Sequence, residues 1–184
     1  MRASVFVGVS VDGFIARPDG ALDFLPPGGG EEHGYEAFFS SVDALVIGRG
    51  TFETVEKFAE WPYGEKRVVV LSSRPIDFSG ERRGPAAGNA SGQRNVEQMS
   101  GLPTEIAARL DASGVRHAYV DGGVTIQRFL RAGLIQRLVI TRVPVLIGSG
   151  IPLFGALDAD VRLRHVATRS YASGLVQSEY AVGD

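Results

Sequence analysis

The chain has 184 residues, 44% of them hydrophobic, so it can bury a substantial core but is too short for two ordinary domains, and we expect a single domain over residues 1–184. Its formal net charge of −2 gives no long-range attraction to nucleic acid or to anionic membranes, which leaves a small molecule as the expected partner. The sequence contains no cysteine, which excludes disulfides, thiolate metal sites and cysteine nucleophiles and favours a reducing, cytoplasmic location.

No targeting or membrane segment is predicted. Strand-like sequence is reached by Ser4, which leaves no room for a basic segment followed by an apolar secretory core. The longest uncharged stretch, residues 143–157, is interrupted by prolines and glycines and is not typical of a membrane helix.

The N-terminal part of the chain predicts a strand, a long loop and a helix. Residues 5–9 are apolar on both faces of a period-two pattern, as in a strand within a covered sheet. Residues 12–30 are rich in glycine, proline and aspartate and predict a loop. Glu31 and Glu32 then open a predicted helix, because acids in a first turn suit the helix dipole. The expected inner face of this helix carries Tyr35, Phe38, Phe39 and Val42.

Two buried strands with abrupt polar ends come next. They are predicted at residues 43–47 and 67–71. A helix between them is expected to end at Trp61-Pro62, because the residue before a proline disfavours helical geometry. The inner side of that helix carries Phe52, Val55 and Phe58.

The second half of the chain continues the alternation. Residues 79–95 lack periodicity, and we interpret them as a mobile loop between core strands. The elements after this loop are expected at 95–99 (strand), 103–114 (helix), 117–120 (strand), 124–132 (helix) and 137–143 (strand). Residues 161–169 and 175–182 predict an antiparallel hairpin around 172–174. Strands that alternate with helices and end in such a hairpin predict an α/β fold with a mixed sheet.

Three short turns that follow predicted strands indicate where a ligand would bind, because open α/β sheets bind ligands beyond the carboxyl ends of their strands. The turns are Gly48-Arg49-Gly50-Thr51, Leu71-Ser72-Ser73-Arg74 and Gly122-Gly123-Val124-Thr125. Glycines let the backbone approach a ligand, and a following helix offers free N–H groups to a phosphate. One such turn is more often only a tight corner, but three in register indicate a phosphate-binding site.

The second of these turns bears on the identity of the ligand. It carries two hydroxyls and a guanidinium but no carboxylate that would accept hydrogen bonds from a free ribose 2′-hydroxyl. This favours a 2′-phosphate, and so NADPH over NADH. A Rossmann interpretation of Gly48-x-Gly50 is weaker, because the third glycine and the ribose-binding acid are missing.

Other chemistries find little support in the sequence. His33, His117 and His165 lie far apart without the spacing of a ligand pair, so no metal site is expected. The segment Gly8-x-Ser10 lacks the closing glycine of a nucleophile elbow, which argues against a serine hydrolase.

Five segments, taken in order, carry a family resemblance. They are residues 10–16, 46–53, 70–73, 120–123 and 143–154, which read SVDGFIA, VIGRGTFE, VLSS, VDGG and VPVLIGSGIPLF. In these segments the chain resembles the dihydrofolate reductase-like superfamily, in the branch related to the C-terminal reductase domain of the bifunctional riboflavin biosynthesis deaminase/reductase. The resemblance implies a three-layer α/β fold with a mostly parallel mixed central sheet, helices on both faces and a C-terminal antiparallel hairpin.

The same resemblance implies NADPH as the hydride donor and a homodimer. It places Ile15 and Ala16 beside the nicotinamide, residues 48–51 and 122–125 around the phosphates, and residues 71–74 around the adenosine 2′-phosphate. The sequence has no cysteine and no His-x-Glu motif, the signature of the zinc deaminase domain of the riboflavin enzyme. We therefore expect a stand-alone reductase.

The resemblance also implies an acid on the first helix that assists protonation of the substrate. Glu36 is the best candidate among Glu31, Glu32 and Glu36, although a solvated helix face is the commoner use of such a residue. Asp12, next to the expected nicotinamide, is the second candidate for substrate contact.

Together these features predict hydride transfer from NADPH to a C=N or C=O bond of a pterin-like or aminopyrimidine-like heterocycle, or of a carbonyl compound. Residues 19–30, with Phe14, Phe24 and Leu25, are expected to line or cover the substrate pocket. Trp61 and Tyr63 could add a stacking face, although core packing is their commoner use. Two alternatives stay open: a true dihydrofolate reductase and a non-catalytic NADP-binding regulatory protein.

Overall fold

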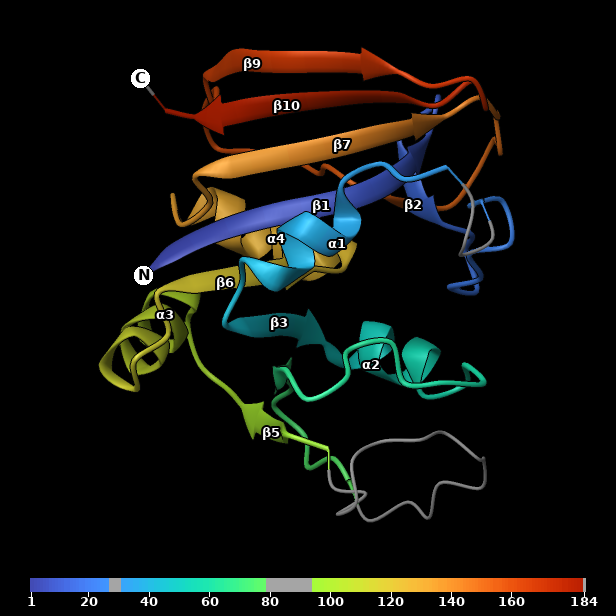
Figure 1. Ribbon diagram of the computed structural model, residues 1–184. Helices are drawn as coiled ribbons and strands as arrows, with labels where there is room; N and C mark the ends of the chain where they lie inside the picture. The colour runs from blue at the N-terminus through green and yellow to red at the C-terminus, as the bar shows by residue number, and fades with distance from the viewer. Residues whose placement is uncertain (27–30, 79–93, 184) are drawn as a thin grey trace.

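The computed structural model describes residues 1–26, 31–78 and 94–183, and an eight-stranded sheet runs through it (Figure 1). Its strands are β1 (Arg2–Ser10), β3 (Ala44–Gly48), β4 (Arg67–Leu71), β5 (Val96–Met99), β6 (His117–Asp121), β7 (Arg137–Val143), β9 (Leu163–Ser170) and β10 (Val176–Val182). The spatial order is β5-β4-β3-β6-β1-β7-β10-β9. The pairs from β5 to β7 are all parallel, and β10 and β9 add an antiparallel hairpin at one edge. The predicted mixed α/β sheet with its C-terminal hairpin is confirmed.

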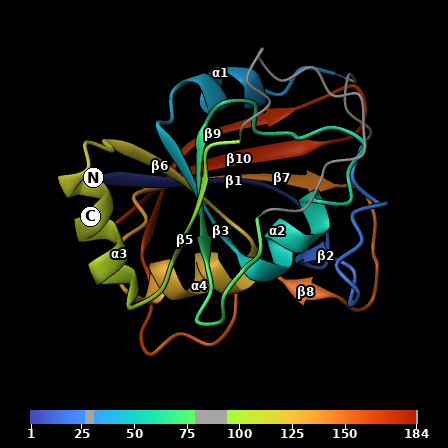
Figure 2. The same cartoon turned by 90° about the horizontal axis from the view of Figure 1, so that it is seen from below.

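Helices cover both faces of this sheet and form two separate cores. Phe38 of α1 (Tyr35–Ser40) stacks on Phe6 of β1, and Phe52 of α2 (Arg49–Val55) belongs to the same core on this face. The helices α3 (Pro103–Ala112) and α4 (Gly123–Arg131) pack on the other face, with Ile106 and Phe129 buried against the valines of β1. Figure 2 shows α1 and α4 on opposite sides of the strands. The apolar two-faced strands predicted from the sequence are therefore covered on both sides, as a parallel sheet requires.

A second, two-stranded sheet was not predicted. It pairs β2 (Phe14–Ala16) with β8 (Ile151–Pro152), within regions that the sequence predicts as loops. The backbone N–H of Phe14 donates to Ser10 Oγ over 3.0 Å, and the N–H of Leu153 donates to the carbonyl of Gly13 over 3.0 Å. These contacts fold β2 back across the carboxyl end of β1, beside the β6–α4 turn.

Two helix boundaries differ from the prediction. The first helix begins at Tyr35 rather than at Glu31, after Gly34 in a left-handed conformation. Glu31 is instead bound to the β9–β10 turn, where its carboxylate accepts hydrogen bonds from the backbone and hydroxyl of Ser173 and from the N–H of Ala172. These three donors compensate Glu31 better than a place in the first helical turn would.

The second helix ends at Val55 instead of reaching Trp61. The N–H groups of Lys57 and Phe58 donate three residues back, to Thr54 and Val55, so the chain tightens into turns before Pro62. Phe58 is consequently exposed rather than packed in the core.

The loop expected over residues 79–95 lies outside the described residues, apart from Arg94 and Asn95. Among the helices that the structure describes, none is long and apolar enough to cross a bilayer.

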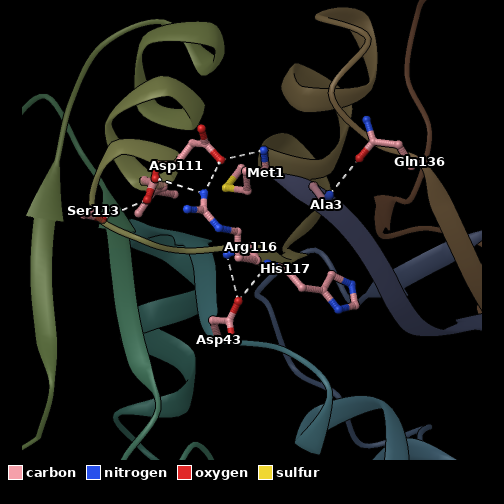
Figure 3. A network of polar contacts seen from close by, with 9 residues as sticks. Met1, Ala3, Asp43, Asp111, Ser113, Arg116, His117 and Gln136 are labelled. Atoms are coloured by element: carbon pink, nitrogen blue, oxygen red, sulfur yellow. Dashed lines mark hydrogen bonds and ion pairs between the residues drawn. The ribbon is translucent and has the colours of Figure 1, made fainter.

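Polar contacts tie the strands together at the amino ends of the sheet (Figure 3). Asp43, just before β3, accepts hydrogen bonds from the backbone N–H groups of Arg116 and His117, each over 2.8 Å. The ring of His117 lies 2.8 Å from Ser4 Oγ and 3.0 Å from the carbonyl of Ser41. Burial lowers the pKa of His117, which favours the neutral ring in this network.

The substitution Asp43→Ala is expected to reduce the free energy of unfolding by about 1 kcal/mol at neutral pH, because two backbone donors lose a charged acceptor at a solvent-exposed position. The hydrogen bonds from His117 and Arg116 lower the pKa of Asp43. Their contribution is therefore present above the unfolded-state pKa and is lost as the pH falls through the folded-state value. Urea unfolding at pH 7 and below pH 4 checks this: a difference between the two proteins that does not shrink in acid contradicts it.

Candidate functional site

A cavity of about 520 Å³ opens at the carboxyl ends of the parallel strands. It lies between the β3–α2 turn, the β6–α4 turn, β2 and the segment that follows β2. Nine of the sequence-predicted residues line it: Ile15, Ala16, Gly48, Gly50, Thr51, Gly122, Gly123, Val124 and Thr125. The fold thus brings the first and third predicted turns together, as their positions after neighbouring parallel strands indicate.

The two turns fit against each other through their glycines and threonines. A Cβ atom on Gly48 would lie 2.9 Å from Thr125 Oγ1, and one on Gly122 would overlap Thr51 Oγ1. Gly122 also has a φ of +89°, which few other residues adopt. By contrast, a Cβ on Gly50 would meet nothing within 4 Å. Gly48 and Gly122 therefore serve the packing of the turns, whereas Gly50 keeps backbone open toward the cavity.

A second cavity, of about 300 Å³, lies on the other side of the β3–α2 turn. The remaining predicted residues line it: Arg49, Leu71, Ser72, Ser73 and Arg74. Arg128 of α4 lines it too and donates to the carbonyl of Gly101 over 3.2 Å. No acidic residue is among its described lining residues, which include three arginines and three serines. Such a set of donors suits a phosphate.

The turn that carries Ser72 and Arg74 is held by Arg49. The Arg49 guanidinium donates to Ser72 Oγ over 3.2 Å and to the carbonyls of Arg74 and Pro75 over 3.0 and 2.6 Å. Gln98 of β5 donates to the carbonyls of Ser72 and Arg74 from the other side. The guanidinium of Arg74 makes no hydrogen bond to any described residue and is exposed. Arg49 therefore shapes the turn, and Arg74 is the cation with all its donors available to a ligand.

Asp121, the last residue of β6, lies in the wall of the first cavity. Its Oδ1 accepts a hydrogen bond from the N–H of Gly122 over 2.7 Å. Burial raises the pKa of Asp121 to about 6, so this carboxyl exchanges a proton close to neutral pH. Tyr35, Tyr63 and Tyr119 line the same cavity, and burial, followed by the charge of Asp121, raises their pKa values.

The two predicted catalytic acids are not brought to this cavity. Asp12 is exposed and accepts hydrogen bonds from the N–H groups of Ile147 and Gly148, over 3.3 and 2.7 Å, so it joins two loops. Glu36 lies on the exposed side of α1, and neither residue lines either cavity. Asp121 and Arg128 are not among the site residues predicted from the sequence. The signal for Asp121 was its place in Val120-Asp121-Gly122-Gly123, at the end of a buried strand.

The segment after β2 covers one side of the first cavity. Leu22 and Leu25 line it, and Arg17 holds this segment by two hydrogen bonds to the carboxylate of Asp23, over 2.6 and 2.9 Å. The expectation that Leu25 lines the pocket agrees with this placement, whereas Phe14 and Phe24 do not line it, and residues 27–30 lie outside the described residues.

Of the two aromatic residues expected to add a stacking face, Trp61 and Tyr63, only Tyr63 lines the cavity. Tyr63 lines the cavity, and Trp61 packs edge-on behind it with ring centroids 5.1 Å apart.

The family model and the similar solved structures point to the same family. A model of the RibD C-terminal domain family matches residues 4–177. A putative riboflavin biosynthesis protein from Shewanella sp. PV-4 is 35% identical, with a TM-score of 0.85 and complete coverage of both chains.

Two further structures, below 25% identity, share the fold. The Thermotoga maritima diaminohydroxyphosphoribosylaminopyrimidine deaminase/5-amino-6-(5-phosphoribosylamino)uracil reductase is 14% identical, with a TM-score of 0.71 over 99% of this chain and 56% of that chain. The present chain thus spans little more than half of that bifunctional protein. Dihydrofolate reductase from Enterococcus faecalis, complexed with NADP(H), is 20% identical, with a TM-score of 0.67 over 100% of this chain and 97% of that chain.

Proposed function

The chain belongs to the RibD C-terminal domain family, and we propose that it is an NADPH-dependent reductase of a small pyrimidine-like or pterin-like heterocycle. The observation that carries this proposal is the division of the predicted turns between two adjacent cavities. One cavity is small and lined by three arginines, and the other is larger, mostly apolar and lined by the partly buried carboxyl of Asp121. This arrangement fits the two ends of a phosphorylated dinucleotide, with room for a second reactant beside its nicotinamide.

The second cavity supports NADPH rather than NADH. A free ribose 2′-hydroxyl is usually recognised by a carboxylate, and none is among the described lining residues of this cavity. Arg74, Arg128 and the hydroxyls of Ser72 and Ser73 would instead surround a 2′-phosphate. The solved dihydrofolate reductase of the same fold contains NADP(H), which agrees with this choice.

In the first cavity, each group of residues has a distinct role. NADPH, when bound, supplies the hydride. Ile15 and Ala16 of β2 would contact the nicotinamide, and Leu22 and Leu25 would exclude water from the reacting atoms. Reduction of a C=N or C=O bond also needs a proton on the nitrogen or oxygen. Asp121 lines the cavity, and burial raises its pKa to about 6, so we assign it the role of holding that proton.

Titration calorimetry with NADPH and NADH tests the cofactor, and loss of NADPH absorbance with aminopyrimidines, pterins and dihydrofolate tests the reaction. NADPH is expected to bind at least about tenfold more tightly than NADH, because at least one charged hydrogen bond to the 2′-phosphate is added. Equal affinities, or no binding of either, contradict the proposal. Tight NADPH binding without turnover of any compound favours a non-catalytic binding protein, and efficient turnover of dihydrofolate favours a true dihydrofolate reductase.

The substitution Gly50→Ala separates cofactor binding from folding. Gly50 is the second residue of α2, where alanine is preferred over glycine by about 0.5–1 kcal/mol, and a Cβ there meets no other atom of the described chain. The variant is therefore expected to melt at the same temperature or higher, and to bind NADPH several-fold more weakly because the new methyl occupies cofactor space. Thermal melting and calorimetry together check this, and unchanged affinity would show that the cofactor does not approach Gly50.

The homodimer and the cytoplasmic location stay predictions. The edge strand β9 is exposed along most of its length, so it is accessible to another chain. Sedimentation velocity over a range of protein concentrations measures the oligomeric state directly.

A further inference from the structure

The two cavities differ in charge as well as in size. Arg49, Arg74 and Arg128 all line the second cavity, and no arginine lines the first within the described part of the chain. The charged residues that line the first cavity are Asp19, Glu53, Asp121 and Lys57. Cationic groups are thus concentrated at the proposed phosphate end of the cofactor, and acidic groups at the proposed substrate end.

The positions of these charged groups disfavour the binding of an anion at the proposed substrate end. Lys57 is exposed, so its ammonium is hydrated. Glu53 lies 3.6 Å from Arg49 and Asp19 accepts a hydrogen bond from Ala21, and both are exposed. Asp121, by contrast, is only partly exposed, and its burial raises its pKa, so water screens its charge less than the charges of the two exposed acids. An anionic substrate would therefore meet carboxylates in a cavity whose described lining offers no arginine and only the exposed Lys57 as a cation.

The other polar groups around Asp121 suit an uncharged heterocycle. Tyr63 is only 4% exposed, and its hydroxyl makes no hydrogen bond to any described residue although the side chain lines the cavity. Tyr35 and Phe6 present aromatic rings in the same wall, 5.5 Å apart. A flat ring with N–H groups could therefore stack on these rings, donate to Asp121 and bond to the Tyr63 hydroxyl.

We propose that this cavity selects an unphosphorylated, neutral or cationic nitrogen heterocycle that donates N–H groups to Asp121, and that it discriminates against a phosphoribosyl substrate. The proposal rests on the reductase function proposed above and names its substrate class. It also marks a difference from the Thermotoga maritima protein of this fold, whose name describes reduction of 5-amino-6-(5-phosphoribosylamino)uracil. With the cofactor in place, its 2′-phosphate would occupy the second cavity, so the arginines there would not be available to a phosphate of the substrate.

The test compares two compounds that differ only in the phosphate: 5-amino-6-(5-phosphoribosylamino)uracil and its dephosphorylated form, 5-amino-6-ribosylaminouracil. Each is titrated calorimetrically into the full chain saturated with NADP⁺, and each is assayed for turnover with NADPH. We expect the dephosphorylated compound to bind at least about tenfold more tightly, because the phosphate would enter a cavity whose described lining has three acidic residues and no arginine. Asp121→Asn should reduce this ratio, and Asp158→Asn, which removes an exposed carboxylate outside both cavities, should leave it unchanged.

The outcomes separate this inference from the proposed function. Tighter binding of the dephosphorylated compound without turnover supports the inference and contradicts the reductase function. Turnover with equal or tighter binding of the phosphorylated compound supports the reductase and overturns the inference. Binding of neither compound also overturns it. A ratio that is the same in Asp121→Asn as in the unmodified protein would show that the discrimination does not come from Asp121, and would overturn the assignment of that residue.

Discussion

Asp121→Asn is expected to lower kcat/KM by at least about 100-fold, the usual scale of the contribution of a general acid. Asparagine has nearly the same shape as aspartic acid, and its oxygen can still accept the hydrogen bond from Gly122 N–H. The substitution therefore removes the exchangeable proton with little change in the β6–α4 turn. Because burial raises the pKa of this carboxyl to about 6, the unmodified protein should lose activity as the pH rises through that region. The variant should lack that limb of the pH profile.

The same substitution is expected to stabilise the protein at neutral pH. The folded-state pKa of Asp121 lies above the unfolded value of 3.8, so the folded state binds the proton more tightly. The contribution of the protonated carboxyl to stability is fully present below the unfolded pKa and is lost as the pH rises through the folded pKa. At pH 7 the buried charge should cost on the order of 1 to 3 kcal/mol, which Asn does not carry.

Steady-state kinetics and thermal melts between pH 4 and pH 8 check both effects. The melting temperature of the variant should exceed that of the unmodified protein at pH 7, and the gap should close between pH 6 and pH 4. Asp158→Asn serves as a control, since it removes an exposed carboxylate that lines neither cavity. Activity of Asp121→Asn within a few-fold of the unmodified protein would exclude Asp121 as the proton donor.

The fold was predictable because the buried strands are apolar on both faces and end sharply in glycine or serine. Residues 67–71, which are followed by Ser72, were predicted at their observed bounds for this reason, and residues 137–143 were also predicted at their observed bounds. The β2–β8 pair was not, since a strand of two or three residues contains no periodicity to detect. The start of α1 was missed because Glu31 binds a turn near the other end of the chain, a contact that local helix signals cannot show.

In the candidate site, the turns after the strands were predictable from the sequence, whereas Asp121 and Arg128 were not. The glycines of the β3–α2 and β6–α4 turns stand out in the sequence, and the structure brings them together at one cavity. Arg128 was missed because it lies on α4 one turn beyond those glycines, where a basic residue usually marks a solvated helix face. Asp121 was missed because an aspartate before two glycines is typical of a turn. Burial raises its pKa, and the cavity that it lines is also lined by residues distant in the sequence, among them Phe6, Tyr35 and Tyr63.

Arg74→Ala is expected to weaken NADPH binding by about 1 to 3 kcal/mol, or about 5- to 150-fold, and to leave NADH binding unchanged. The reason lies in the free guanidinium of Arg74, which has no hydrogen bond to a described residue and faces a cavity without a lining acid. Its removal should subtract contacts to the 2′-phosphate without disturbing the turn, because the turn is held through the Arg74 carbonyl.

Arg49→Ala provides the contrast that makes this prediction specific. Arg49 donates to Ser72 Oγ and to the carbonyls of Arg74 and Pro75, so its loss should loosen the turn itself. We expect Arg49→Ala to lower the melting temperature and to weaken both cofactors, whereas Arg74→Ala should change neither the melting temperature nor the NADH affinity. Calorimetry and melting of the two variants side by side decide the matter. NADPH and NADH differ only in the 2′-phosphate. Equal losses of affinity for both in Arg74→Ala would therefore show that Arg74 does not contact this phosphate.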